Sequence, residues 1–299
     1  KIGDKAKAAA RQLATATTPA KNAALRKSAE SLRRRQNEIL SENAKDITAA
    51  QEEAIGSALL DRLVLNEERI EAMAKSLNDI AELPDPVGAI TDEWERPNGL
   101  RIQRRRVPLG VIGIIYESRP NVTADAGALC LKAGNSTILR GGSESFHSSA
   151  AIIESLSEGL NTAGLPDAAI QRVPTRDRAA VGEMLQMTDA LDVIIPRGGK
   201  SLIERVSAES RVPLFKHLEG LCHCYVNRAA DPDMARDVVV NSKMRRTSIC
   251  GATETVLMDM EVAAALLPPI LDGLIDAGCE VRGDAAIQAL DERVVAATD

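Results

Sequence analysis

Apolar side chains in about the first eighty residues recur at the 3.6-residue spacing of amphipathic helices. Thr18 is followed by Pro19, which predicts a helix that Thr18 caps and that has proline at its first position. A further helix is expected after Asn66, since the apolar residues that follow it share one face: Ile70, Met73, Ala74, Leu77 and Ile80. These helices are expected to cover a core that later parts of the chain supply.

From Leu109 onward the pattern alternates between continuous apolar runs of strand length and helical stretches. Strands are predicted at L-G-V-I-G-I-I-Y (109–116), T-I-L-R (137–140), A-I-Q-R-V (169–173) and A-L-D-V-I-I-P-R (190–197). Such runs are typical of strands buried on both faces of a parallel sheet. The alternation predicts β-α-β units with right-handed crossovers, and hence a doubly wound α/β fold. A ligand is expected at the carboxyl ends of these strands.

The pattern predicts two domains and a projecting hairpin. We assign residues 1–226 to the first domain, with V-P-L-F-K (212–216) and C-H-C-Y-V (222–226) as its last strands. Residues 227–299 are expected to be the start of a second, incomplete α/β domain. Asn98-Gly99 lies between two extended runs, which predicts a charged β-hairpin over residues 93–107.

Composition excludes several classes of partner and site. The 299 residues carry a net charge of −6 and only 2% aromatic residues, so neither nucleic acid nor an anionic membrane is an expected partner. The first residues lack the apolar core of a secretory signal, and no run of about 18 uncharged apolar residues occurs. Five cysteines without C-x-x-C spacing favour reduced thiols in the cytoplasm.

Two glycine turns follow predicted strands and are candidates for binding an anion. Gly141, Gly142 and Ser143 come directly after T-I-L-R, whose last residue is Arg140. Gly198-Gly199 precede Lys200-Ser201, but Ile194 stands where a phosphate loop requires a glycine, and no G-x-G-x-x-G occurs. Either pair of glycines alone is compatible with a tight turn. Two such turns on adjacent crossovers of one sheet favour a nucleotide.

Cys250 is the candidate nucleophile among the five cysteines. It lies in a short polar segment close to the cations Lys243, Arg245 and Arg246, and nearby cations stabilise the thiolate that attacks a carbonyl carbon. A structural thiol at the entrance of a strand stays an open alternative. A Cys-His protease is also compatible with the spacing, although it would leave the glycine turns without a role.

The other cysteines give weaker signals. On a strand, Cys222 and Cys224 face one side and His223 the other, so the three residues do not suit one tetrahedral metal ion, and we expect no metal. Cys130 and Cys279 lie in apolar stretches and are expected to be small hydrophobic residues.

Several blocks of the sequence resemble the aldehyde dehydrogenase superfamily, and in particular its branch that reduces glutamyl phosphate in proline biosynthesis. The blocks follow one another across essentially the whole chain: V-P-L-G-V-I-G-I-I-Y-E-S-R-P-N-V-T, T-I-L-R-G-G-S-E-S, D-V-I-I-P-R-G-G-K-S-L-I, K-H-L-E-G-L-C-H-C-Y-V and V-N-S-K-M-R-R-T-S-I-C-G-A-T-E-T. The resemblance implies reduction of L-glutamate 5-phosphate to L-glutamate 5-semialdehyde, with NADPH as the cofactor, release of phosphate and a cysteine thioester as the intermediate.

The resemblance also implies roles for the domains. Residues 1–226 would bind the cofactor, 227–299 would begin the catalytic domain, and the hairpin over 93–107 would mediate formation of a homo-oligomer, a dimer or a tetramer. Members of that branch continue past the last matching block, so the C-terminal part of the catalytic domain is expected to be absent.

Individual residues acquire expected roles by the same resemblance. Cys250 would be the nucleophile, and either Asn121 or Ser118 would stabilise the oxyanion. Glu219 matches the base that activates water in oxidising relatives, and it would have less to do in a reduction. The cofactor-binding candidates are Arg140, Gly141, Gly142, Ser143, Pro196, Gly198 and Gly199, and the substrate-binding candidates are Lys243, Arg245, Arg246 and Glu219.

Two alternative functions remain open from the residues. One is an aldehyde-oxidising enzyme with the same fold. The other is a truncated protein without catalytic activity, which binds a nucleotide or which binds a partner through the hairpin from Trp94 to Gln103.

Overall fold

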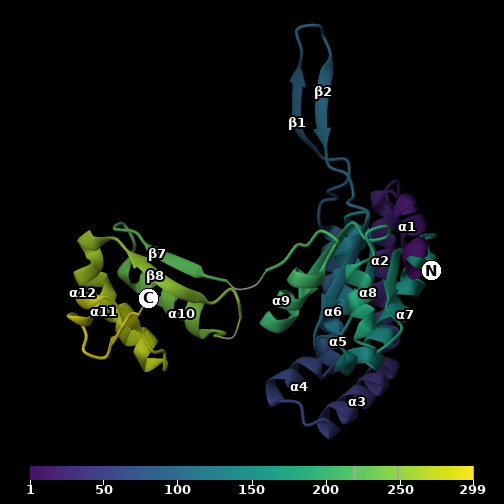
Figure 1. Cartoon of the computed structure of the whole chain (residues 1–299). Coiled ribbons are helices and arrows are strands. Elements are labelled where there is room, and N and C mark those ends of the chain that lie inside the picture. The colour runs from purple at the N-terminus through teal and green to yellow at the C-terminus, as the bar shows by residue number, and fades with distance from the viewer. Residues whose placement is uncertain (218–219, 248, 299) are drawn as a thin grey trace. The chain divides into compact units, whose positions relative to one another are not determined.

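The computed structural model describes residues 1–217, 220–247 and 249–298. The chain divides into two compact units, Lys1–His217 and Leu218–Asp299, which are described separately (Figure 1). Among the residues that the structure describes, no helix has both the length and the apolar character needed to span a membrane.

The first unit is built on a four-stranded parallel sheet with the strand order β5-β4-β3-β6. Its strands are β3 (Val111–Tyr116), β4 (Ser136–Arg140), β5 (Ile170–Arg172) and β6 (Val193–Arg197). All six residues of β3 are buried, as expected for a central strand with helices on both faces. The chain adds β4 and β5 on one side of β3 and then β6 on the other, so the order of the strands reverses at β3.

Helices cover both faces of this sheet, which confirms the predicted doubly wound α/β fold (Figure 1). One apolar core packs α2 (Thr18–Arg34), α5 (Glu67–Glu82), α6 (Asn121–Lys132) and α7 (Phe146–Thr162) against one face. The other core packs α1, α8 and α9 against the opposite face. The remaining helix bounds are α1 (Ile2–Leu13), α3 (Gln36–Glu52), α4 (Ser57–Leu63), α8 (Ala179–Leu185) and α9 (Lys200–Glu209).

Two helix starts were predicted from capping residues, and one of them is off by one residue. Asn66 caps α5, because its side-chain oxygen accepts the N–H of Arg69 at 2.8 Å. The cap of α2 is Thr17 and not Thr18, since the Thr17 hydroxyl accepts the N–H of Ala20. The Thr18 hydroxyl instead donates to Asp85 at 2.6 Å, which explains the shift.

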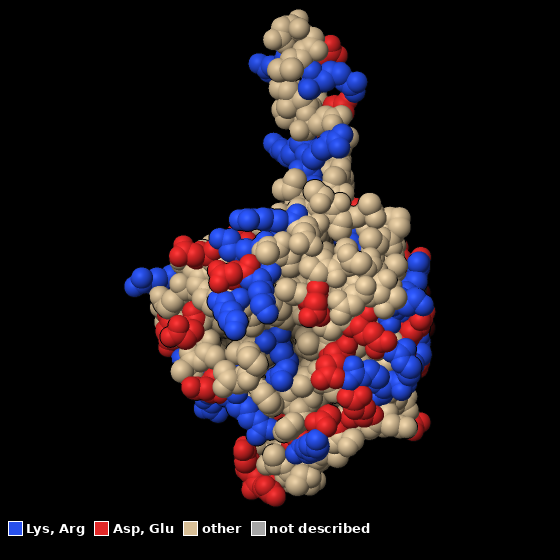
Figure 2. All heavy atoms as spheres, turned by 90° about the vertical axis from the view of Figure 1, so that its right-hand side faces the viewer, with Lys and Arg blue, Asp and Glu red and all other residues tan. Residues whose placement is uncertain are grey.

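The hairpin consists of β1 (Ile90–Glu95) and β2 (Arg101–Arg105), which pair antiparallel and extend away from the helices of the first unit (Figure 1). Gly99 in the connection has φ of +81°, a conformation that suits glycine. All residues of β1 are exposed. Figure 2 shows basic side chains on the hairpin and around its base.

The second unit contains a parallel pair of strands, β7 (Cys222–Val226) and β8 (Thr253–Met258), and a short pair, β9 (Arg282–Gly283) and β10 (Val295–Ala296). Its helices are α10 (Pro232–Met244), α11 (Met260–Asp276) and α12 (Ala285–Gln288). Apolar side chains of α10 and α11 pack on β7 and β8 to form a separate small core.

Two strands assigned to the first domain from sequence are placed differently. C-H-C-Y-V forms β7, but β7 pairs with β8 in the second unit. V-P-L-F-K forms no strand, and only Leu214 makes an isolated bridge, to Ile194 of β6. The contact boundary between the units therefore falls after His217, ahead of the boundary predicted after residue 226.

Candidate active site

A hollow of about 520 Å³ lies in the first unit at the carboxyl ends of β3 and β4, beside α8 and α9. This is the edge of the sheet at which the sequence predicts a ligand. The residues that follow each strand form much of its wall. The polar residues that line it are Glu53, Glu117, Ser118, Arg140, Ser143, Glu144, Arg178, Ser201 and Arg205.

The first glycine turn brings a buried arginine to this hollow. Arg140 is 6% exposed, and its guanidinium donates to the carbonyl oxygens of Gly141 and, at 3.1 Å, Arg176. The Arg140 Nε has no hydrogen-bond partner among the described residues. A Cβ on Gly141 would lie 3.0 Å from the Tyr116 hydroxyl, so a larger residue would crowd the buried tyrosine here. Buried polar groups are usually hydrogen-bonded, so this N–H is a candidate contact for a ligand.

The second glycine turn meets a carboxylate from the end of β3. The backbone N–H of Gly199 donates to Glu117 Oε2 at 2.8 Å, directly ahead of α9. A Cβ on Gly198 would lie 2.6 Å from the Glu117 carboxyl carbon. Pro196 is buried in β6, where it lies opposite Ile115 of β3, so it belongs to the sheet just before the second turn. Both glycine turns and Glu117 therefore belong to one edge of one sheet.

Both candidates for the oxyanion donor already donate hydrogen bonds to a neighbouring carboxylate. The N–H and hydroxyl of Ser118 both donate to Glu144 Oε1 at 2.6 Å, and Ser118 has the left-handed φ of +43°. Asn121 is the first residue of α6, and its side-chain amide donates to Asp125 at 3.0 Å. Ser118 lines the hollow.

In the second unit, Cys250 lies in a tight turn between α10 and β8 and is exposed. The N–H of Ala252 donates to the carbonyl of Ile249 at 3.1 Å, which closes the turn. Ala252 is buried, so the strand side of the turn is anchored in the core of this unit. The hydroxyl of Thr253 also donates to Ser242 of α10 at 2.9 Å. The sequence therefore presents the thiol to solvent on a turn that is fixed at its base.

The segment leading into β7 packs against the backbone of Cys250. The thiol of Cys222 donates to the Cys250 carbonyl oxygen at 3.3 Å. A Cβ on Gly220 would overlap that oxygen and lie 3.0 Å from the carbonyl carbon. Only glycine permits this approach, so Gly220 and Cys222 fix the position of the residue that carries the candidate nucleophile.

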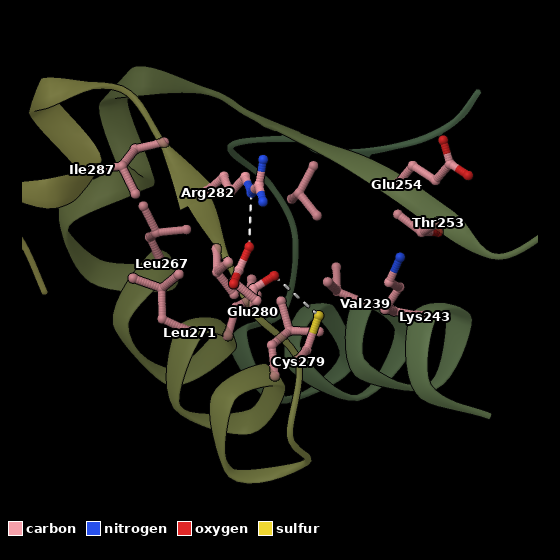
Figure 3. A pocket seen from close by; sticks show the side chains of 14 residues that line it. Val239, Lys243, Thr253, Glu254, Leu267, Leu271, Cys279, Glu280, Arg282 and Ile287 are labelled. Atoms are coloured by element: carbon pink, nitrogen blue, oxygen red, sulfur yellow. Dashed lines mark hydrogen bonds and ion pairs between the residues drawn. The ribbon is translucent and has the colours of Figure 1, made fainter. Parts of the chain in front are cut away.

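The predicted substrate-binding cations divide into two groups. Arg245 and Arg246 follow α10 and are exposed, while Lys243 is half-buried in its last turn. Lys243 lines a pocket of about 250 Å³ between α10, α11 and β8, walled mainly by aliphatic side chains (Figure 3). In Figure 3 its ammonium group lies near Thr253. Cys250 is not among the residues that line this pocket, so the pocket is not part of the candidate site around the thiol.

The other cysteines differ from Cys250 in their burial. Cys130 is 6% exposed in α6, and burial raises the pKa of its thiol to about 12. Cys222 and Cys224 are half-buried and His223 is exposed, as expected for opposite faces of a strand. Glu219, predicted to bind substrate, lies outside the described residues.

Sequence reasoning missed four residues that contact the candidate sites. Glu117 and Glu144 lie within the quoted blocks but were assigned no role, although each follows a strand and could reach the backbone donors there. Gly220 and Cys222 were also missed in relation to Cys250. A glycine just before a strand is a weak sequence signal of close backbone approach.

The architecture and the two candidate sites together point to one protein family. A doubly wound domain carries two glycine turns at its carboxyl edge, and a following α/β unit presents one exposed cysteine on a turn. Residues 1–274 match the aldehyde dehydrogenase family, and the chain belongs to this family. Enzymes of the family use nicotinamide cofactors.

The more similar relatives share one name. The gamma-glutamyl phosphate reductase of Rhodospirillum rubrum is 64% identical over 297 residues, which are 99% of this chain and 70% of that protein. The crystal structure of gamma-glutamyl phosphate reductase from Thermotoga maritima has a TM-score of 0.91 and 41% identity, covering 100% of this chain and 72% of that one. The crystal structure of gamma-glutamyl phosphate reductase from Saccharomyces cerevisiae has a TM-score of 0.68 and 26% identity. The match covers 98% of this chain and 73% of that one. Within its family, the chain is a member of the gamma-glutamyl phosphate reductases.

The residues of the hollow fit a nicotinamide cofactor. Arg140 offers a buried N–H without a partner, and Arg178 and Arg205 add two further guanidinium groups to the wall. Guanidinium groups bind phosphate oxygens well. The glycine turns let the backbone approach a ligand closely.

Proposed function

We propose that the protein reduces L-glutamate 5-phosphate to L-glutamate 5-semialdehyde with NADPH and releases phosphate, a step of proline biosynthesis. The observation that carries this proposal is the exposed Cys250 on its anchored turn, in a chain 64% identical to a gamma-glutamyl phosphate reductase. An acyl phosphate is an electrophile with a good leaving group, so a single thiol nucleophile is enough to begin the reaction.

Cys250 would perform the covalent chemistry. Its thiolate attacks the acyl carbon, the carbon–oxygen bond to phosphate breaks, and the acyl group remains on sulfur as a thioester. NADPH, when bound, supplies the hydride that reduces this thioester. Cys250 is regenerated when the carbon–sulfur bond of the reduced adduct breaks and the aldehyde leaves. Water takes no part in this sequence, so Glu219 is not needed as a base here.

Arg245 and Arg246 are the cations most available to an anionic substrate, because both are exposed close to Cys250 in sequence. We propose that they attract the phosphate or carboxylate of the substrate. Lys243 is half-buried and lines the apolar pocket, so we propose that it contributes less to substrate binding. Asn121 or Ser118 would stabilise the oxyanion that forms during attack.

The cofactor would be held by the hollow of the first unit. Arg140, Gly142 and Ser143 line this hollow, and Gly141 belongs to the same turn. Pro196, Gly198 and Gly199 belong to the second glycine turn, which contacts the hollow through Glu117. We propose that the cofactor is NADPH and not NADH, because three guanidinium groups line the hollow. The guanidinium group of Arg178 forms no ion pair with any described residue. An additional phosphate on the cofactor would suit an unpaired guanidinium.

An assay run in the reverse direction tests this function. The purified protein is mixed with L-glutamate 5-semialdehyde and NADP⁺, with and without inorganic phosphate, and NADPH is followed by absorbance. NADPH formation that requires phosphate supports the proposal. Formation without phosphate would indicate an aldehyde-oxidising enzyme. No turnover under either condition would indicate a protein without catalytic activity.

A further inference from the structure

The Glu117 carboxylate lies at the start of α9. It follows β3 directly, lines the hollow, and accepts the Gly199 N–H at 2.8 Å. Gly199 is the N-cap of α9, a ten-residue helix, and as glycine it has no side chain to cap the helix itself. The N-terminus of a helix attracts negative charge, so the Glu117 carboxylate acts there as an internal anion.

A separate feature of the same hollow indicates a ligand that carries phosphate. Arg140 is more than nine-tenths buried, and its Nε has no partner among the described residues. Arg178 and Arg205 line the same space. Two other carboxylates reach it, those of Glu53 and Glu144, and Glu144 already accepts two hydrogen bonds from Ser118. The hollow thus combines guanidinium groups for an anion with a carboxylate placed on a backbone donor.

We propose that Glu117 competes with the diphosphate of the cofactor for the N–H of Gly199. Without cofactor, the carboxylate caps α9. With cofactor, the carboxylate must leave the N–H, because two anions cannot share one donor without strong repulsion. Glu117 thereby lowers the affinity for cofactor, which favours release after turnover. This inference rests on the proposed function, since it assumes that the hollow binds NADPH.

Glu117→Gln tests the inference by removing the charge while keeping nearly the same shape. A neutral amide oxygen binds the Gly199 N–H less strongly than a carboxylate, and it repels no phosphate. We expect NADPH to bind the variant about tenfold more tightly, as measured by isothermal titration calorimetry on the purified protein. Adenosine 2′-monophosphate lacks the diphosphate, so its dissociation constant should change less than about twofold.

Glu204→Gln is the matched control. Glu204 lies on the same helix α9 and is exposed, but it does not line the hollow, so this variant removes the same charge without altering the contact at Gly199. Its affinity for NADPH should remain close to that of the wild type. An equal gain from both variants, or no gain from Glu117→Gln while the wild type binds NADPH, would overturn the inference and leave the proposed function standing. No binding of NADPH by the wild type would refute the proposed function and the inference with it.

Discussion

Cys250 and Cys130 carry the same thiol in opposite surroundings. Cys250 is exposed on its turn, whereas Cys130 is 6% exposed and burial raises the pKa of its thiol to about 12. Only thiolate reacts quickly with iodoacetamide. At pH 8 we expect alkylation of Cys250 and none of Cys130 in the folded protein, as determined by peptide mass mapping. Denatured protein should be alkylated at both residues. Equal alkylation of the two in the folded state would contradict the site.

Gly220 packs closely against the backbone of Cys250. In Gly220→Ala the new methyl group would overlap the carbonyl oxygen of Cys250, and the turn would have to move. A displacement of about 1 Å in a nucleophile can lower the rate on the order of 100-fold. We expect kcat to fall by that order while the dissociation constant for NADPH is unchanged. Gly182→Ala is the control, because nothing lies within 4 Å of its Cβ position. A normal kcat in Gly220→Ala would show that the contact is unimportant.

A buried ion pair links the segment between α5 and β1 to α2. Lys21 of α2 is fully buried, and its ammonium lies 2.7 Å from Asp85. Burial alone raises the pKa of Asp85, but hydrogen bonds from Lys21, Thr18 and the N–H of Val87 outweigh it, so this pKa lies below its usual 3.8. Asp85 therefore stabilises the fold above the unfolded-state pKa, and the stabilisation is lost as pH falls through the lower folded-state pKa.

Asp85→Asn should lower the free energy of unfolding at pH 7 by about 3 kcal/mol, because it leaves the Lys21 charge buried without a counter-ion. Between pH 6 and pH 3 the wild type should lose more stability than the variant, which has no carboxyl group to protonate there. Urea unfolding at a series of pH values measures both. Glu82→Gln, which breaks an exposed pair with Arg26, should have little effect. Parallel pH profiles for wild type and Asp85→Asn would contradict this account.

The sequence predicted elements better than the partners of those elements. Buried strands, glycine turns and the exposed cysteine follow from local pattern, so the first sheet and both turns could be predicted. β7 could not be placed, because a short run such as C-H-C-Y-V fits either sheet and its pairing with β8 depends on distant residues. Likewise, Thr17 and Thr18 are equally suitable caps in sequence, and Asp85 in a later segment decides between them.

The contact between Glu117 and Gly199 shows the same limit for the site. The two residues are 82 positions apart, and only the reversal of strand order at β3 brings the ends of β3 and β6 together. Residue type and spacing therefore identify the two turns as candidates for binding an anion, but they do not identify the side chain that contacts one of them.

The exposed hairpin is a candidate surface for association between copies of the chain. None of the β1 side chains is buried, Trp94 is 40% exposed, and an isolated two-stranded hairpin is marginally stable in water. We propose that a second copy of the chain covers it. Trp94→Glu should then lower the mass measured by light scattering and leave NADPH affinity unchanged, whereas Trp94→Phe should keep the assembly. An unchanged mass in Trp94→Glu would refute a role for the hairpin in assembly.

The proposed reaction requires Cys250 to carry the acyl group, and its covalent adduct can be measured directly. Protein incubated with L-glutamate 5-semialdehyde and NADP⁺, but without phosphate, has no acceptor to release the acyl group. Mass spectrometry should then show a glutamyl thioester on the peptide that contains Cys250, and adding phosphate should remove it. Cys250→Ala should form no adduct. An adduct on another cysteine, or none at all in a protein that turns over with phosphate, would contradict the account.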